Sequence, residues 1–134
     1  MPELAKFEGR WSLDRSIEDR RAGQTGRFEG DAVFDASPDG LIYREAGSLR
    51  LGQGPAMRSE RRYVWREASG GIAVTFEDGR PFHRFSDTAP EALHLCGPDR
   101  YEVAYDFSGW PYWTATWTVS GPAKDYTMTS RYRR

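Results

Sequence analysis

Three charged residues lie where an alternating chain otherwise places apolar side chains. Arg15, Glu45 and Arg61 each share a side of their segment with aromatic and aliphatic residues. An unpaired charge that is buried costs several kcal/mol, so these groups need a partner, water or a ligand. Two cations beside one anion would leave a positive charge, which an anionic group such as a carboxylate could neutralise, because a guanidinium binds it in a bidentate way. The alternatives are a closed ion-pair network and a register shift that turns one member outward.

Aromatic side chains on the same sides predict the apolar wall of a binding site. Trp113 and Trp117 project in one direction with the small Ala115 between them, and Trp65 shares a side with Arg61. Such rings either pack as a core or leave a slot for a planar guest. Tyrosine hydroxyls add polar tips to these sides, and the candidates are Tyr43, Tyr63, Tyr101, Tyr105 and Tyr126. Polar tips that converge in an apolar chamber are typical of a small-molecule site, unless each hydroxyl reaches bulk water or a backbone carbonyl.

The turn segment DGRPFH supplies the candidates for catalysis. Asp78 and His83 flank a turn that we expect at the rim of the fold, where His83 could transfer protons with Asp78 or Asp106 orienting its ring. The alternative is a structural turn in which His83 caps a loop. No Ser-His-Asp elbow, phosphate-binding loop or paired-carboxylate motif is recognisable, so whether the protein is an enzyme is left open.

His94 and Cys96 are two residues apart, so a strand would present both on one side. That spacing suits a thiolate beside a base, or two metal ligands. No third ligand is spaced alongside, and Leu93 and Leu95 could be the inward pair instead. We therefore predict no metal site.

Alternation of apolar and polar residues runs through almost the whole chain and predicts about ten strands. The apolar sides take every second position in segments 7–17, 28–34, 41–49, 57–65, 72–76, 101–107, 113–119 and 126–132, and EALHLC at 91–96 is a further strand. A short helical turn is expected within Pro2–Phe7. We expect residues 1–134 to form a single all-β domain, a closed up-and-down antiparallel barrel of about 8–10 strands, with a two-sheet sandwich as the alternative.

Composition narrows the partners and the compartment. The 134 residues carry a formal net charge of −1, which argues against nucleic acid although RSERRYVWRE mixes arginines with rings. No stretch approaches the roughly 20 apolar residues of a membrane span. One cysteine excludes an internal disulfide, and MPELAKFEG lacks the basic start and apolar run of a signal peptide, so we expect a cytoplasmic protein. A homodimer is left open.

The segment FEGRWSL resembles the Gly-X-Trp opening of the calycins, the group that contains lipocalins and fatty-acid-binding proteins. The resemblance implies a barrel in which a short helical turn leads to a first-strand tryptophan, here Trp11, that closes one end. It also implies a basic residue late in the last strand that lies over this ring. Arg131 and Arg133 are the candidates.

A longer likeness covers nearly the whole chain. DGRPFH, CGPDRYEVAYDF, WPYWTATWTVSGPAKDY and MTSRY resemble an uncharacterised family of bacterial and fungal proteins, with Ala123 where the pattern usually has a basic residue. This resemblance implies a lipocalin-like barrel and supplies no catalytic residues. We predict no cofactor. Some calycin-like barrels bind haem, so haem with His83 or His94 as axial ligand is the alternative.

These patterns predict a barrel that binds a small apolar or aromatic ligand with an anionic end. Trp65, Trp113 and Trp117 would supply apolar contact, and Arg15 and Arg61 would meet the charge. Two other classes are open. One is a small cofactor-free lyase, isomerase or hydrolase that uses the rim histidine, and the other is a protein-interaction module with a filled interior.

Overall fold

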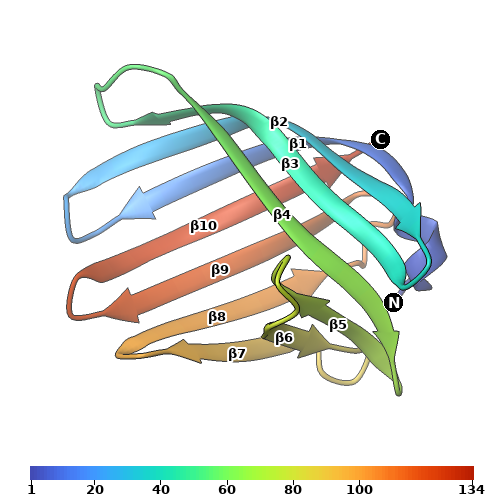
Figure 1. Cartoon of the computed structure of the whole chain (residues 1–134). Helices are drawn as coiled ribbons and strands as arrows, with labels where there is room; N and C mark the ends of the chain where they lie inside the picture. Colours follow the sequence, from blue (N-terminus) through green and yellow to red (C-terminus); the bar gives the residue numbers. More distant parts are fainter.

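Ten antiparallel strands form one sheet in which almost every strand pairs with its neighbours along the chain. The computed structural model describes all 134 residues. In chain order the elements are η1 (Leu4–Phe7), β1 (Gly9–Asp19), β2 (Gln24–Ser37), β3 (Gly40–Leu51), β4 (Met57–Ala68), β5 (Gly71–Thr75), β6 (Pro81–Phe85), β7 (Glu91–Cys96), β8 (Asp99–Asp106), β9 (Trp113–Gly121) and β10 (Lys124–Arg133). This arrangement confirms the predicted all-β class and the short helical turn (Figure 1).

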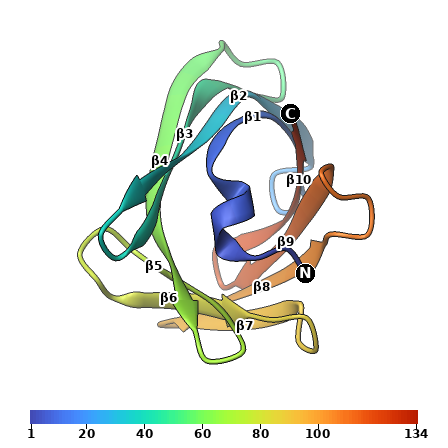
Figure 2. The ribbon, with the colours of Figure 1, turned by 90° about the vertical axis from the view of Figure 1, so that its right-hand side faces the viewer.

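The sheet closes on itself through its first and last strands. β1 pairs with β2 on one side and with β10 on the other, where Leu13 lies opposite Tyr132. The two remaining edges, β6 and β7, lie in contact without a hydrogen-bonded ladder between them. Viewed along its axis the sheet is a barrel with η1 inside one end (Figure 2). The barrel is therefore nearly closed, with a single seam between β6 and β7.

Two glycines allow β2 and β3 to approach closely. Gly30 and Gly47 lie opposite each other in the ladder. A Cβ atom on Gly30 would lie 2.1 Å from the Ala46 carbonyl oxygen, and one on Gly47 would lie 2.2 Å from that of Glu29. Only glycine fits at such a distance, and the close crossing lets the sheet curl.

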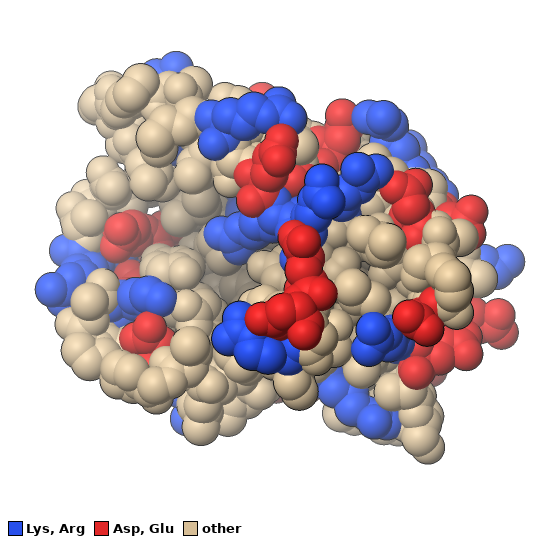
Figure 3. All heavy atoms as spheres, in the orientation of Figure 1, with Lys and Arg blue, Asp and Glu red and all other residues tan.

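The two faces of the strands differ as the alternation predicts. In β1 the side chains of Trp11, Leu13 and Arg15 are buried inside the barrel, and those between them face outward. The outer face carries ion pairs between neighbouring strands, among them Arg10–Asp31, Arg27–Asp14 and Arg44–Asp35, and Arg20 of the β1–β2 turn pairs with Asp125 of β10. Figure 3 shows positive and negative residues interspersed over this surface. Exposed pairs contribute about 1 kcal/mol or less each, so the inner face dominates stability.

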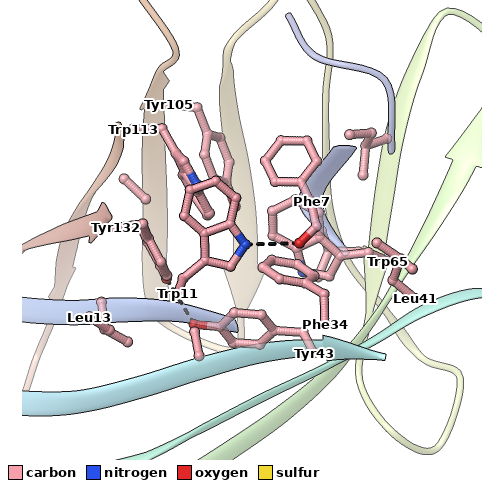
Figure 4. Close-up of a cluster of buried hydrophobic side chains, with 14 of the residues drawn as sticks. Phe7, Trp11, Leu13, Phe34, Leu41, Tyr43, Trp65, Tyr105, Trp113 and Tyr132 are labelled. Carbon is pink, nitrogen blue, oxygen red and sulfur yellow. Dashed lines mark hydrogen bonds between the residues drawn. The ribbon is translucent and has the colours of Figure 1, made fainter. Parts of the chain in front are cut away.

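A cluster of aromatic rings fills the end of the barrel that holds η1. Phe7 and Trp11 are fully buried, and the Trp11 indole Nε1 donates a hydrogen bond to the Phe7 carbonyl at 2.8 Å (Figure 4). Trp113 stacks on Tyr132 with ring centroids 3.7 Å apart. Trp11 therefore closes this end as the calycin resemblance implied. Trp113, which we predicted in the ligand site, belongs to this plug.

A basic side chain covers the Trp11 ring, but it is neither of the two predicted. The Arg134 guanidinium lies 3.9 Å from the ring centroid of Trp11 and donates to the Glu8 carbonyl. Arg133 instead lies over Tyr112, and Arg131 donates to Ser16. Arg134 follows β10, which ends at Arg133, and from there its guanidinium lies over the plug.

Candidate ligand cavity

The end of the barrel opposite η1 contains a cavity of about 720 Å³. It is lined by 22 residues, 15 of them hydrophobic, which come from β1, β3 to β10 and the turn between β5 and β6. Figure 3 shows the surface hollowed on its left side, where the turns β7–β8 and β9–β10 lie in Figure 1. The barrel is thus solid at one end and hollow at the other.

Every predicted ligand-binding residue except Trp113 lines this cavity. These residues are Arg15, Tyr43, Glu45, Arg61, Tyr63, Trp65, His83, Tyr101, Tyr105, Trp117 and Tyr126. Sequence reasoning missed other wall residues, including Phe76, Phe82, Met128 and Tyr132. Met128 and Tyr132 share the alternating face of Tyr126, so the same signal could have found them. Phe82 is the residue that the register irregularity between β5 and β6 leaves unpaired, between Pro81 and His83, and alternation alone does not reveal this.

A stack of rings forms the wall beside the seam. Phe82 of β6 lies parallel to Trp117 of β9, with centroids 5.1 Å apart and an interplanar angle of 12°. It also stacks on Tyr63 and on Phe76, at 5.4 and 4.7 Å. These rings offer flat apolar faces suited to an aromatic or apolar guest.

Arg15 and Glu45 form a closed ion pair at the inner part of the cavity. The Arg15 Nη1 and Nη2 atoms donate to the two Glu45 carboxylate oxygens at 2.7 and 2.9 Å, and Nε donates to the Ser130 hydroxyl at 2.7 Å. Arg15 is only 6% exposed and Glu45 only 3%. Burial by itself would raise the pKa of Glu45, but hydrogen bonds and charge attraction from Arg15 hold that pKa below its usual value.

Two tyrosines complete this network, and its protons have a definite order. The Tyr43 hydroxyl lies 2.7 Å from a Glu45 oxygen and 2.8 Å from the Tyr132 hydroxyl. An ionised carboxylate only accepts, so Tyr43 donates to Glu45 and Tyr132 donates to Tyr43. Burial raises the pKa of Tyr43 well above its usual value and that of Tyr132 to about 12, so both keep their protons.

Arg61 does not join the network, although it lies directly opposite Glu45 in the ladder between β3 and β4. It lines the cavity but is exposed, and it forms no salt bridge within the chain. Arg15 is neutralised by Glu45, and Arg80 is paired with Asp78 at 2.7 Å. The predicted three-residue network is therefore corrected. It closes as a pair. Arg61 attracts Glu45 only weakly, as the last of the causes that lower the pKa of that carboxyl, and is the cavity arginine without a salt bridge.

His83 lies inside the barrel and not at the predicted rim. It is 9% exposed, and its Nε2 atom lies 2.8 Å from the Tyr105 hydroxyl, while Nδ1 has no hydrogen-bond partner. Burial, with a smaller effect from His94, lowers the pKa of His83 to about 3, so the ring is neutral near pH 7.

The acidic residues that we expected beside His83 lie elsewhere. Asp78 is exposed in the turn and accepts hydrogen bonds from the backbone and side chain of Arg80. Asp106 accepts a hydrogen bond from the Ser108 backbone. No carboxylate orients the His83 ring, so the predicted acid–base pair is not formed.

The structure settles which side of β7 faces inward. His94 lines the cavity and packs against Phe76 and Phe82, whereas Leu93 and Leu95 are 47% and 64% exposed. Leu95 and the exposed Cys96 also border the cavity, at the end of β7. The alternative with both leucines inward is therefore wrong. The chain contains no group of three or more histidine, cysteine, aspartate or glutamate side chains that could hold a metal ion.

An antiparallel meander that closes through its first and last strands, with an aromatic plug at one end and a cavity at the other, defines a lipocalin-like barrel. A family model matches residues 7–134, and the chain belongs to that family, the family of unknown function DUF6314. No curated protein matches the chain in sequence.

A solved structure shares the fold. The chain is similar to the S-type phycobiliprotein lyase CPES from Guillardia theta, with a TM-score of 0.64 and 10% sequence identity. The match covers 98% of this chain and 89% of that chain. At this identity the likeness establishes the lipocalin-like fold and nothing about the site. None of the helices has the length and apolar character needed to cross a bilayer.

Proposed function

We propose that the protein binds a small, largely apolar or aromatic molecule with an anionic group inside its barrel. The observation that carries this proposal is the cavity of about 720 Å³ with mostly hydrophobic walls. Small-molecule sites usually measure about 300–1,000 Å³ and combine apolar walls with a few polar groups. A hollow interior also counts against the filled interaction module.

The anionic group of the ligand binds Arg61. Arg15 already shares its charge with Glu45 and cannot accept an anion without leaving that carboxylate unpaired in a buried place. Arg61 lines the cavity, is exposed and has no acidic partner. The rings of Tyr63, Phe82 and Trp117 contact the apolar part of the ligand. We place this binding protein in the cytoplasm, because a single exposed cysteine suits a reducing compartment.

The test uses anilinonaphthalene sulfonate, an aromatic anion whose fluorescence rises in apolar sites. We expect saturable binding to the native protein and about tenfold weaker binding to Arg61→Met, because a charge-assisted hydrogen bond contributes about 1.5–3 kcal/mol. Arg62→Met is the matched control, since the adjacent side chain does not line the cavity. It should bind as the wild type does.

A thermal-shift screen then searches for better ligands among fatty acids, aromatic acids and haem. A ligand at a hundred times its dissociation constant stabilises the fold by about 2.7 kcal/mol, which raises the Tm of a chain of this size by about 10 °C. Absence of both dye binding and any Tm shift would refute the proposal.

An enzyme that uses His83 is the second candidate, favoured by the place of this ring in the cavity. If the protein is such an enzyme, His83→Phe should lose substrate turnover and still bind anilinonaphthalene sulfonate.

A further inference from the structure

The polar groups of the cavity form two sets. In the closed set every side-chain hydroxyl hydrogen is paired within the chain, and in the open set some hydrogen-bonding groups are left without a partner. In the closed set, Tyr132 donates to Tyr43, Tyr43 donates to Glu45, and Arg15 donates to both oxygens of that carboxylate. Every hydroxyl hydrogen of these tyrosines is used within the chain. This network therefore links strands of the barrel and leaves no hydroxyl hydrogen free for a ligand.

The open set is the pair formed by His83 and Tyr105. Their only side-chain hydrogen bond is the one between the imidazole Nε2 and the phenol oxygen, at 2.8 Å. When the phenol donates, the imidazole keeps an unpaired N–H at Nδ1 and the phenol keeps a free acceptor. When the imidazole donates, the phenol keeps a free O–H and Nδ1 is a free acceptor. Almost none of the Nδ1 surface is accessible, so an N–H at Nδ1 would be buried without a partner. The imidazole therefore donates from Nε2, and the Tyr105 phenol keeps one donor and one acceptor for a ligand in the cavity.

The unused hydrogen-bonding capacity of the His83–Tyr105 pair lies in an apolar environment. Both side chains line the cavity, and both are more than nine-tenths buried. Rings surround the imidazole, with Phe85 and Trp117 centroids 6.0 and 5.1 Å away. A purely apolar ligand that displaced water here would leave the Tyr105 phenol O–H unpaired, at a cost of about 1–3 kcal/mol.

The pair is also uncharged. Burial lowers the pKa of His83 to about 3 and raises that of Tyr105 well above its usual value. A second carboxylate or an ammonium group of a ligand would find no opposite charge at this position. A neutral group that both donates and accepts fits it, and a hydroxyl is the simplest such group.

We propose that the His83–Tyr105 pair is a second binding subsite, which receives a hydroxyl group of the ligand while Arg61 receives its anionic group. This inference rests on the proposed function and narrows its ligand class to hydroxylated aromatic or aliphatic acids. Sites built to bind a hydroxyl discriminate strongly against the analogue without it, because their own polar groups are then left unpaired.

The experiment measures competition with anilinonaphthalene sulfonate by two matched pairs of probes. The pairs are cinnamate with para-hydroxycinnamate, and dodecanoate with omega-hydroxydodecanoate, so that a rigid and a long spacer are both tested. In the wild type we expect the hydroxylated member of at least one pair to bind about tenfold more tightly.

Tyr105→Phe removes only the phenol oxygen and keeps the ring that stacks on Phe85 at 4.0 Å. We expect it to reduce the hydroxyl preference below about threefold while the affinity for the unhydroxylated probe is unchanged. Tyr112→Phe is the control, since Tyr112 is 37% exposed, lies outside the cavity and makes no hydrogen bond to His83. It should keep the full preference.

The outcomes separate the two proposals. Equal binding within both pairs, or no displacement by any hydroxylated probe, overturns the subsite and leaves the proposed function in place as long as the dye binds. A preference that survives in Tyr105→Phe also overturns the subsite. Failure of the wild-type protein to bind the dye refutes the proposed function. The wild-type comparison needs no variant, so a variant that fails to fold does not block the test.

Discussion

Arg15 sits among aromatic rings in the barrel, and its charge is tolerated there because Glu45 faces it at bidentate distance. Removal of one partner from such a pair leaves an uncompensated buried charge, whereas replacement of both by apolar residues is often neutral. The pair therefore contributes less to net stability than the loss of one member would suggest.

Glu45→Gln should lower the free energy of unfolding by about 3 kcal/mol, measured by urea denaturation, because it leaves the buried Arg15 guanidinium without a counter-charge. The double variant Arg15→Met with Glu45→Leu should regain most of that loss. Glu60→Gln, which breaks the exposed pair with Arg58, is the control and should change stability by less than about 0.5 kcal/mol. A Glu45→Gln variant as stable as the wild type would contradict a buried charged pair.

The buried, neutral His83 should make the folded protein less stable at acidic pH. Its pKa is about 3 in the folded protein and 6.5 in the unfolded chain, so the unfolded chain binds more protons between these values. Stability is therefore complete above pH 6.5 and falls as the pH drops towards 3. From pH 7 to pH 5 we expect a loss of about 2 kcal/mol in the free energy of unfolding, followed by denaturant titration at each pH.

Glu45 contributes to the acid sensitivity only at lower pH. Its pKa in the fold is lowered from 4.5, so its stabilisation is present above pH 4.5 and is lost as the pH falls further. Between pH 5 and pH 7 the slope is assigned to His83, and His83→Phe should flatten it. An unchanged slope in His83→Phe would show that the imidazole is not buried in its neutral form.

Among the elements, the β2–β3 pair sets the curvature that brings the faces of the barrel together. Gly30 and Gly47 leave no room for a Cβ atom at their crossing. Glu45 lies two residues before Gly47 on the same inner side of β3, and from there it reaches Arg15 in β1 across the intervening β2. The glycines thus connect local backbone geometry to the closed ion pair.

Gly47→Ala should destabilise the protein by about 2 kcal/mol, because the new methyl group would overlap the Glu29 carbonyl oxygen and force the strands apart. The measurement is the Tm together with denaturant unfolding. Gly109→Ala serves as the comparison, since its nearest neighbour would be a Tyr112 side-chain atom at 3.3 Å. Equal losses in both variants would contradict a special role for the β2–β3 crossing.

The molecule as a whole has two unlike ends and one seam. Rings from η1, β1, β9 and β10 fill one end, whereas the other end is open to a cavity. Because β6 and β7 share no ladder, the seam is the part of the wall with the fewest backbone hydrogen bonds. It is formed by two of the shortest strands, of 5 and 6 residues.

Hydrogen exchange should therefore be fastest along this seam. We expect the amides of β6 and β7 to exchange at least about tenfold faster than those of β1, β2 and β10, because local opening there breaks fewer hydrogen bonds. Mass spectrometry after pepsin digestion resolves these strands. Binding of anilinonaphthalene sulfonate should slow exchange in β6, whose Phe82 and His83 line the cavity. Uniform protection around the barrel would mean that the seam is bridged in solution.

Several features followed from the order of residues alone, because side chains on a strand alternate between two faces. Period two marked nearly all the strands and identified the inner side. It also showed that Arg15 and Glu45 are charges on an apolar face. The likeness of FEGRWSL to the calycins indicated that Trp11 closes one end.

The depth of each side chain along the barrel axis and the choice of ion partner for Glu45 were decided only by the tertiary structure. Trp113 and Trp117 share a face, but four residues of strand span roughly 13 Å, so one lies in the plug and the other in the cavity. Alternation also places both Arg15 and Arg61 on the inner face with Glu45, so it does not predict which arginine pairs with that carboxylate. Only the curl of the sheet brings Arg15 within reach from across β2, whereas Arg61 stays at the exposed part of β4. Sequence patterns report the face of a side chain, and contacts between distant strands depend on how the sheet is bent.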